Sequence, residues 1–245
     1  MRLGLGLSLG STYAGGGGSF NPATLGASGR WGPDYVGSPW VGAAGGNLTS
    51  GGAPVTGTAV NSKVPASFNG TTHQMASASA ISSYLSAAAF GVALLVKPAA
   101  AGADPGAGTR NTARTILSDG GAGYFGVGIT TTGPVAYVYD TAYQDVIATT
   151  ANPVGAWHVI WVTLSGGVLS VALDGGAYST KSLTPTGDGS IDVLTGVLTT
   201  GSGFGGLFFS GDEMEIYTRA TAWTAPERAA LYAYLQTTYP AMSLP

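Results

Sequence analysis

Short apolar segments separated by glycine-containing turns run through most of this sequence, and this pattern limits the possible folds more than any other feature. Glycine costs a helix interior about 1 kcal/mol relative to alanine, but it supplies the positive φ angles that tight turns need. The chain has 41 glycines in 245 residues and only 9% charged residues. We therefore expect one all-β domain whose surface is rich in Gly, Ser, Thr and Ala.

Individual strands can be placed from apolar runs and from the turns between them. Residues 90–97 are apolar up to Lys97 and are followed by Pro98, which predicts a central strand buried on both faces. Residues 157–164 and 168–173 flank Ser165-Gly166-Gly167 and predict a hairpin. Close spacing favours antiparallel pairing of the further strands, expected at residues 115–118, 124–130, 135–140, 145–149, 191–199, 206–210 and 214–218.

A single helix is predicted near the C-terminus. Thr224 and Glu227 have the spacing of a capping box, Pro226 suits the first helical turn, and Pro240 ends the apolar periodicity. The predicted helix covers about residues 225–238 and packs one face on the sandwich. Residues 1–20 alternate Leu with Gly before a glycine run, and we interpret them as an arm that precedes one domain at 21–245.

Charge and composition exclude several classes of partner. The net charge is −3 and the basic residues are scattered, which disfavours nucleic acid because phosphate binding needs clustered Lys and Arg. The absence of cysteine excludes disulfides and thiolate metal sites. No window is apolar for long enough to span a membrane, and the N-terminus lacks the pattern of an export signal.

Four stretches taken in order resemble the concanavalin A-like lectin and glucanase superfamily, and within it the laminin-G-like domains of phage and bacterial surface proteins. They lie at residues 65–75 (PASFNGTTHQM), 90–98 (FGVALLVKP), 157–161 with 169–175 (WHVIW and LSVALDG), and 213–217 leading to 227–235 (EMEIY and ERAALYAYL). The resemblance implies a two-sheet antiparallel jelly roll. It implies no single activity, because this fold carries lectins, glycosidases and virion proteins.

The residues that could carry catalysis are few. Glu213 and Glu215 are expected to point to one face of a strand, but they do not match the E-x-D-x-x-E pattern of the glucanases. His73 and His158 lack the context of a catalytic triad, and His158 reads as a structural histidine within a strand. We therefore expect a protein that is not an enzyme.

Aromatic side chains give the best prediction of a binding site. Tyr137 and Tyr139 share a strand face, and Asp140 and Tyr143 follow them, so the group could stack on a sugar and bind its hydroxyls. Buried packing of the same rings is the alternative. No cofactor is expected. Calcium is compatible with several aspartates in turns, although it cannot be assigned to any one of them. These aspartates are Asp119, Asp140, Asp145, Asp174 and Asp188.

The function expected from these features is a structural or adhesive component of a bacteriophage particle, such as a capsid decoration, head-fibre or tail protein at the virion surface. Its partners would be other virion proteins, copies of itself (a trimer is one option) and a cell-surface glycan. The alternatives are a carbohydrate-binding lectin-like module and, third, a glycoside hydrolase that uses Glu213 and Glu215.

Overall fold

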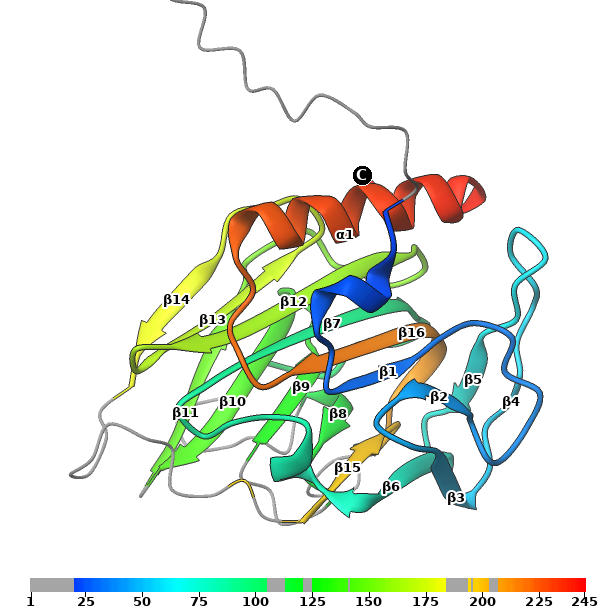
Figure 1. The fold of residues 1–245 in the computed structure, drawn as a ribbon, viewed down its shortest axis with the longest axis horizontal. Helices are drawn as coiled ribbons and strands as arrows, with labels where there is room; N and C mark the ends of the chain where they lie inside the picture. The colour runs from blue at the N-terminus through cyan, green and yellow to red at the C-terminus, as the bar shows by residue number, and fades with distance from the viewer. Residues whose placement is uncertain are drawn as a thin grey trace, which may run out of the picture.

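The structure is a computed structural model that describes residues 20–104, 113–120, 125–140, 142–183, 194, 196–202 and 207–245. Two antiparallel sheets pack face to face, and the helix α1 (Ala225–Thr238) lies on the outer face of the larger sheet (Figure 1). This arrangement confirms the expected two-sheet sandwich with one C-terminal helix. Among the described residues, no helix is long and apolar enough to cross a membrane.

The larger sheet has nine described strands, with the chain's longest strands at its centre. In spatial order they are β14 (Ser179–Ser182), β13 (Val168–Leu173), β12 (His158–Ser165), β7 (Ala89–Pro98), β16 (Ser210–Arg219), β1 (Gly29–Trp31) and β2 (Gly42–Ala44), with β5 (Ala66–Asn69) on β16 and β4 (Val55–Thr56) on β5.

The smaller sheet has seven described strands and contains the predicted meander. Its order is β11 (Ala142–Ile147), β10 (Pro134–Asp140), β9 (Phe125–Ile129), β8 (Arg114–Ser118), β15 (Val197–Thr200), β6 (Gln74–Ala80) and β3 (Leu48–Gly52). Short 3₁₀ turns at Pro22–Leu25, Ile81–Ser83 and Pro240–Met242 complete the described elements.

The β12–β13 hairpin shows how local sequence sets register. Ser165 pairs with Val168, so the loop consists of Gly166 and Gly167, whose φ angles are 56° and 72°. Two consecutive positive φ angles match the right-handed twist of the flanking strands, and glycine adopts them without strain. The predicted hairpin is confirmed.

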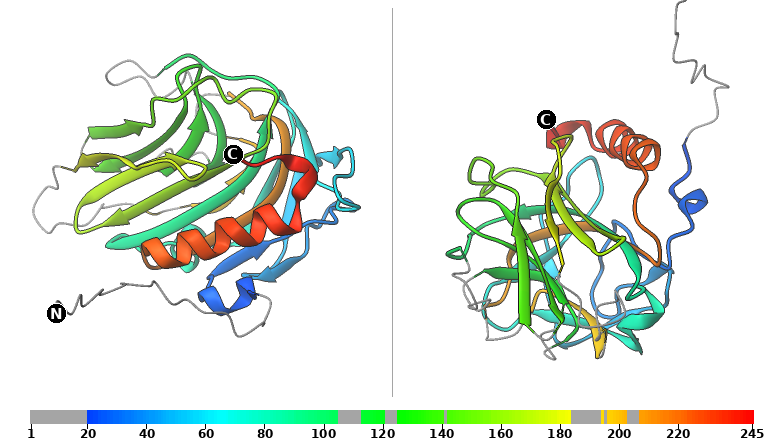
Figure 2. Two further views of the ribbon diagram at one scale, coloured as in Figure 1. Left: turned by 90° about the horizontal axis from the view of Figure 1, so that it is seen from above. Right: turned by 90° about the vertical axis from the view of Figure 1, so that its left-hand side faces the viewer.

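Strand β7 is the centre of the molecule, as expected for residues 90–97. It pairs with β12 on one side and with β16 on the other, and its side chains alternate between two separate cores. Leu94 points into the core between the sheets, whereas Leu95 points into a second core beneath α1. The result is three layers, helix, larger sheet and smaller sheet, which Figure 2 shows in its right-hand view.

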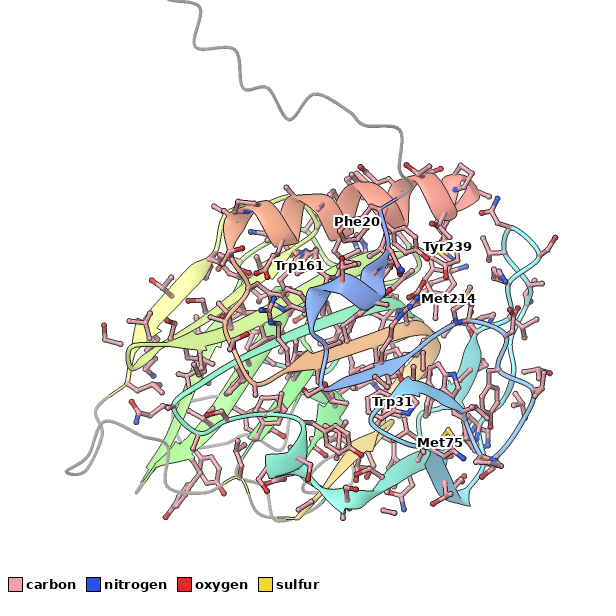
Figure 3. All side chains as sticks on the ribbon, viewed as in Figure 1. Phe20, Trp31, Met75, Trp161, Met214 and Tyr239 are labelled. Atoms are coloured by element: carbon pink, nitrogen blue, oxygen red, sulfur yellow. The ribbon has the colours of Figure 1, made fainter. Side chains whose placement is uncertain are left out.

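Helix α1 begins as the capping box predicts. The Thr224 side chain accepts a hydrogen bond from the Glu227 amide, and Glu227 accepts one from the Thr224 amide at 2.9 Å. Leu231 and Leu235 are buried against the sheet. Trp161 of β12 fills the space between helix and sheet, and Tyr239 packs under the helix end (Figure 3).

Some strand boundaries differ from the sequence expectation. Strand β11 covers Ala142–Ile147 rather than 145–149, because Tyr143 pairs across the ladder with Tyr139 instead of lying in the turn. Residues 207–209 form only an isolated bridge, between Phe208 and Thr115, before β16 begins.

Two predicted segments lie partly outside the described residues: the strand at 191–199 and the N-terminal arm. Of the arm, only Phe20 is described, and its ring centroid lies 5.8 Å from that of Tyr234.

Candidate functional site

The structure gathers the predicted tyrosines on the outer face of the smaller sheet. Tyr139 lies directly opposite Tyr143, with ring centroids 4.8 Å apart. Tyr137 is on the same face but only 2% exposed, because its ring lies over Gly126, where an added Cβ would meet it at 2.1 Å. Of the two alternatives for these rings, buried packing therefore holds for Tyr137, and Tyr139 forms a half-buried pair with Tyr143. Whether the group binds a sugar stays a prediction. Asp140 pairs through its backbone with Ala142, and its side chain lies outside the description.

Glu213 and Glu215 do not share a strand face, contrary to the sequence expectation. Glu213 pairs with Val96 and Glu215 pairs with Leu95, so the register shifts by one residue between them. A bulge of this kind turns the next side chain to the other face. The two carboxyls consequently face different cores, and this pair cannot flank one glycosidic bond.

Each of the two buried glutamates has its own hydrogen-bond partners. Glu213 is fully buried between the sheets, where the Thr200 hydroxyl donates to it, and burial raises its pKa to about 8. Glu215 lies beneath α1, accepts from the hydroxyls of Tyr217 and Tyr239, and also has its pKa raised by burial. Both residues act as polar ties between layers.

His158 is hydrogen-bonded to a carboxylate, an arrangement compatible with the structural role predicted from the sequence. Its Nδ1 lies 2.7 Å from Oδ2 of Asp174, and Oδ1 of Asp174 accepts from the Val159 amide at 2.8 Å. These contacts fix Asp174 at a positive φ of 53° at the end of β13. Nδ1 of His73 lies 3.3 Å from the carbonyl oxygen of Ser67.

A cavity of about 410 Å³ lies between α1 and the turn that follows β13. Its walls carry three aromatic side chains from separate parts of the chain, together with a cation and a carboxylate. The aromatic residues are Tyr178, Trp223 and Tyr232; the charged ones are Asp174 and Arg228; the remaining lining is Gly175, Thr224, Ala225, Ala229, Ala233 and Gln236. Ligand sites typically combine a largely apolar lining with a few placed polar groups.

Arg228 is held rigidly at this cavity. Its Nη2 donates to the carbonyls of Asp174 at 2.8 Å and Gly176 at 2.5 Å, which joins the helix to the turn. The guanidinium carbon lies 4.5 Å from the Tyr178 ring centroid and 5.4 Å from that of Trp161. Stacking between two rings, together with the hydrogen bonds, fixes the position of the charge before any ligand arrives.

The aromatic walls are anchored from behind. Trp223 is 6% exposed and packs on Gly91, where an added Cβ would lie 2.8 Å from the indole nitrogen, so only glycine leaves room for the ring. The Tyr232 hydroxyl donates to the Pro245 carbonyl, and burial, assisted by the Asp174 carboxylate, raises its pKa to about 12. The cavity wall is thus preorganised.

Metal ligation receives no positive support within the described ranges. Those residues include no group of three or more His, Asp or Glu side chains placed to hold an ion. Asp188, one of the turn aspartates considered for calcium, lies outside the described residues. The calcium prediction therefore stays untested.

No local sequence pattern marks this cavity. Its lining comes from residues 174–178 and 223–236, which are joined only when α1 packs on the larger sheet. Among the lining residues, the sequence singles out only Asp174 for binding, as a turn aspartate compatible with calcium.

Comparisons with known proteins place the fold. No family model matches the sequence, and no curated protein matches it. Domain 4 of AbnA, a GH43 extracellular arabinanase from Geobacillus stearothermophilus solved with arabinotriose, is 14% identical, with a TM-score of 0.59 over 84% of this chain and 98% of that domain.

Two further solved structures share the architecture. The binding domain of botulinum neurotoxin serotype G is 11% identical, with a TM-score of 0.60 over 86% of this chain and 51% of that domain. Trypanosoma rangeli sialidase is 13% identical, with a TM-score of 0.57 over 87% of this chain and 33% of the enzyme. The chain thus spans about half of the toxin domain and a third of the sialidase. At these identities the likeness establishes a two-sheet β-sandwich fold and no activity.

Proposed function

We propose that this chain is a non-catalytic, lectin-like carbohydrate-binding module that holds sugar in the cavity beside α1. The observation that carries the proposal is that Tyr178, Trp223 and Tyr232 line one cavity together with Arg228, which two backbone carbonyls hold in place. Aromatic rings present flat apolar faces to the C–H faces of sugars, and Tyr and Trp also keep a polar edge.

The polar groups of the cavity suit a ligand rich in hydroxyls. Arg228 is a donor that two backbone carbonyls already hold in place. Its side chain therefore loses little conformational entropy on binding, which is one of the main costs of association. A sugar could stack on the rings while its hydroxyls reach the guanidinium and the polar rim.

The fold is compatible with this role. One similar structure was solved with arabinotriose and another is a toxin binding domain. The proposal that the module is non-catalytic rests on the cavity lining, in which Asp174 is the one carboxylate among the described residues, and its oxygens are engaged by His158 and the Val159 amide. Hydrolysis by the common mechanism needs two carboxylates across one bond.

The experiment is a glycan array followed by titration calorimetry on the full chain. Tyr178→Ala removes one aromatic wall and should weaken binding at least tenfold, which corresponds to about 1.4 kcal/mol. Tyr139→Ala, on the outer face of the other sheet, is the matched control and should bind like wild type.

The two variants separate the possible outcomes. A loss in Tyr139→Ala with normal binding by Tyr178→Ala would move the site to the tyrosines predicted from sequence. An array without any binding would refute the module itself.

The virion role expected from the sequence stays a prediction, because the similar structures do not bear on it. Co-sedimentation of the chain with phage particles would support a capsid or tail location, and a protein that stays monomeric and apart from particles would contradict it. A virion protein could also bind glycan, so the two roles are compatible.

A further inference from the structure

The cavity beside α1 is elongated. Its helical lining runs from Thr224 through Arg228 and Tyr232 to Gln236 along one side of α1. At a rise of about 1.5 Å per residue, these positions span about 18 Å, several times the width of one sugar ring. The cavity is therefore a groove parallel to the helix.

Possible contacts are spread along this groove. Trp223 lies at the start of the helix, Tyr178 faces Arg228 near the first turns, and Tyr232 follows one turn later. At the far end lies Gln236, whose amide nitrogen is held by the carbonyls of Leu244 and Pro245, each at 3.3 Å. Contacts distributed in this way suit a ligand that lies lengthwise.

The charges of the groove do not favour an acidic ligand. Arg228 uses Nη2 for two carbonyls. Both forks by which a guanidinium grips a carboxylate in two places include Nη2, so Nε and Nη1 are left to donate only single hydrogen bonds. Asp174 adds a negative charge to the same wall. One cation beside one carboxylate leaves the groove formally neutral.

We propose that the groove binds a neutral, linear oligosaccharide along several consecutive sugar residues, rather than a single terminal sugar. This inference rests on the proposed carbohydrate-binding function and adds the class of ligand. Affinity then increases with chain length until the groove is filled.

The test is calorimetry with two neutral series, α-1,5-arabino-oligosaccharides and β-1,4-cello-oligosaccharides of one to four residues, and with trigalacturonate as the acidic probe. In at least one neutral series, the trimer should bind tenfold or more tightly than the monomer, and the tetramer should add little. Trigalacturonate should bind no better than the neutral trimer.

A pair of helix variants localises the effect. Ala233→Trp fills the groove towards its far end and should lower trimer affinity to that of the monomer. Thr237→Trp, an exposed position on the same helix outside the groove lining, should bind like wild type. Both substitutions are at exposed positions, and circular dichroism would check that both variants fold.

Three results would overturn the inference. They are equal affinity for monomer and trimer, tighter binding of trigalacturonate, and no binding by either neutral series. Each leaves the proposed function open, since an array that detects other glycans through Tyr178 would still support it. Failure of the array as a whole would refute both.

Discussion

Glu213 places a carboxyl group in the core between the sheets, where few charged groups are tolerated. It is 0% exposed, its Oε1 has no hydrogen-bond partner among the described residues, and only Thr200 donates to its other oxygen. Burial raises its pKa from 4.5 to about 8 because the charged form loses its hydration. At neutral pH this residue is therefore predominantly protonated in the folded protein.

This shift predicts a pH-dependent stability. Between pH 4.5 and about 8 the unfolded chain releases the Glu213 proton, whereas the folded chain keeps it. The stability that protonated Glu213 contributes to the folded state is therefore complete below pH 4.5 and is lost as the pH rises through about 8. Glu213→Gln keeps a partner for Thr200 without a charge. Between pH 5 and pH 8.5 the free energy of unfolding of this variant should fall less than that of the wild type. The difference between the two falls should be on the order of a few kcal/mol.

Urea titrations at the two pH values would measure the difference. Asp212→Asn is the matched control, because it removes a carboxylate from the neighbouring residue, which is half-buried rather than in the core. Equal pH dependence in wild type and Glu213→Gln would contradict the shifted pKa.

At the scale of single elements, α1 depends on its first turn and on two leucines. The capping box satisfies amides that the helix leaves unpaired, and Leu231 and Leu235 hold the helix on the larger sheet. The same helix supplies one side of the candidate site, so its anchoring determines the shape of the groove.

Removing the cap should destabilise the protein measurably. Thr224→Ala deletes the hydroxyl that accepts from the Glu227 amide, and we expect the free energy of unfolding to fall by about 1 kcal/mol. Thr237→Ala, in the last turn and exposed, should change it by less than about 0.5 kcal/mol. Chemical denaturation would measure the free energy of unfolding of both variants. Equal losses in Thr224→Ala and Thr237→Ala would show that the cap contributes nothing specific.

At the scale of the whole molecule, the three layers share their central strands. Leu94 and Leu95 of β7 face different cores, and β12 and β16 likewise contribute to both. A strand that is common to two cores cannot leave one of them without disturbing the other. We therefore expect the described domain to unfold as one cooperative unit.

A single core variant tests that cooperativity. Leu235→Ala beneath α1 should cost about 2 to 5 kcal/mol. It should lower the helix signal in circular dichroism and the exchange protection of β9 amides at the same denaturant concentration. If only the helix signal moved, α1 would be an independent layer. Thr237→Ala, at an exposed position of the same helix, is the control and should move neither signal.

Much of this fold follows from local chemistry that the sequence displays. Gly166 and Gly167 define a hairpin, Thr224 and Glu227 define a helix start, and the apolar run at 90–97 defines a central strand, because each depends on the conformational preferences of a few adjacent residues. The non-enzymatic expectation and the virion role rest on the sequence as well, and both stay predictions.

The tertiary structure decided what adjacent residues could not. The bulge between Glu213 and Glu215 turns their carboxyls toward different cores. The β10–β11 register pairs Tyr139 with Tyr143, while Tyr137 is buried.

The candidate groove exists only because α1 packs beside the turn after β13, which brings Arg228 to the carbonyls of Asp174 and Gly176. Side-chain facing and long-range packing depend on the whole chain, so no local pattern of residues contains them.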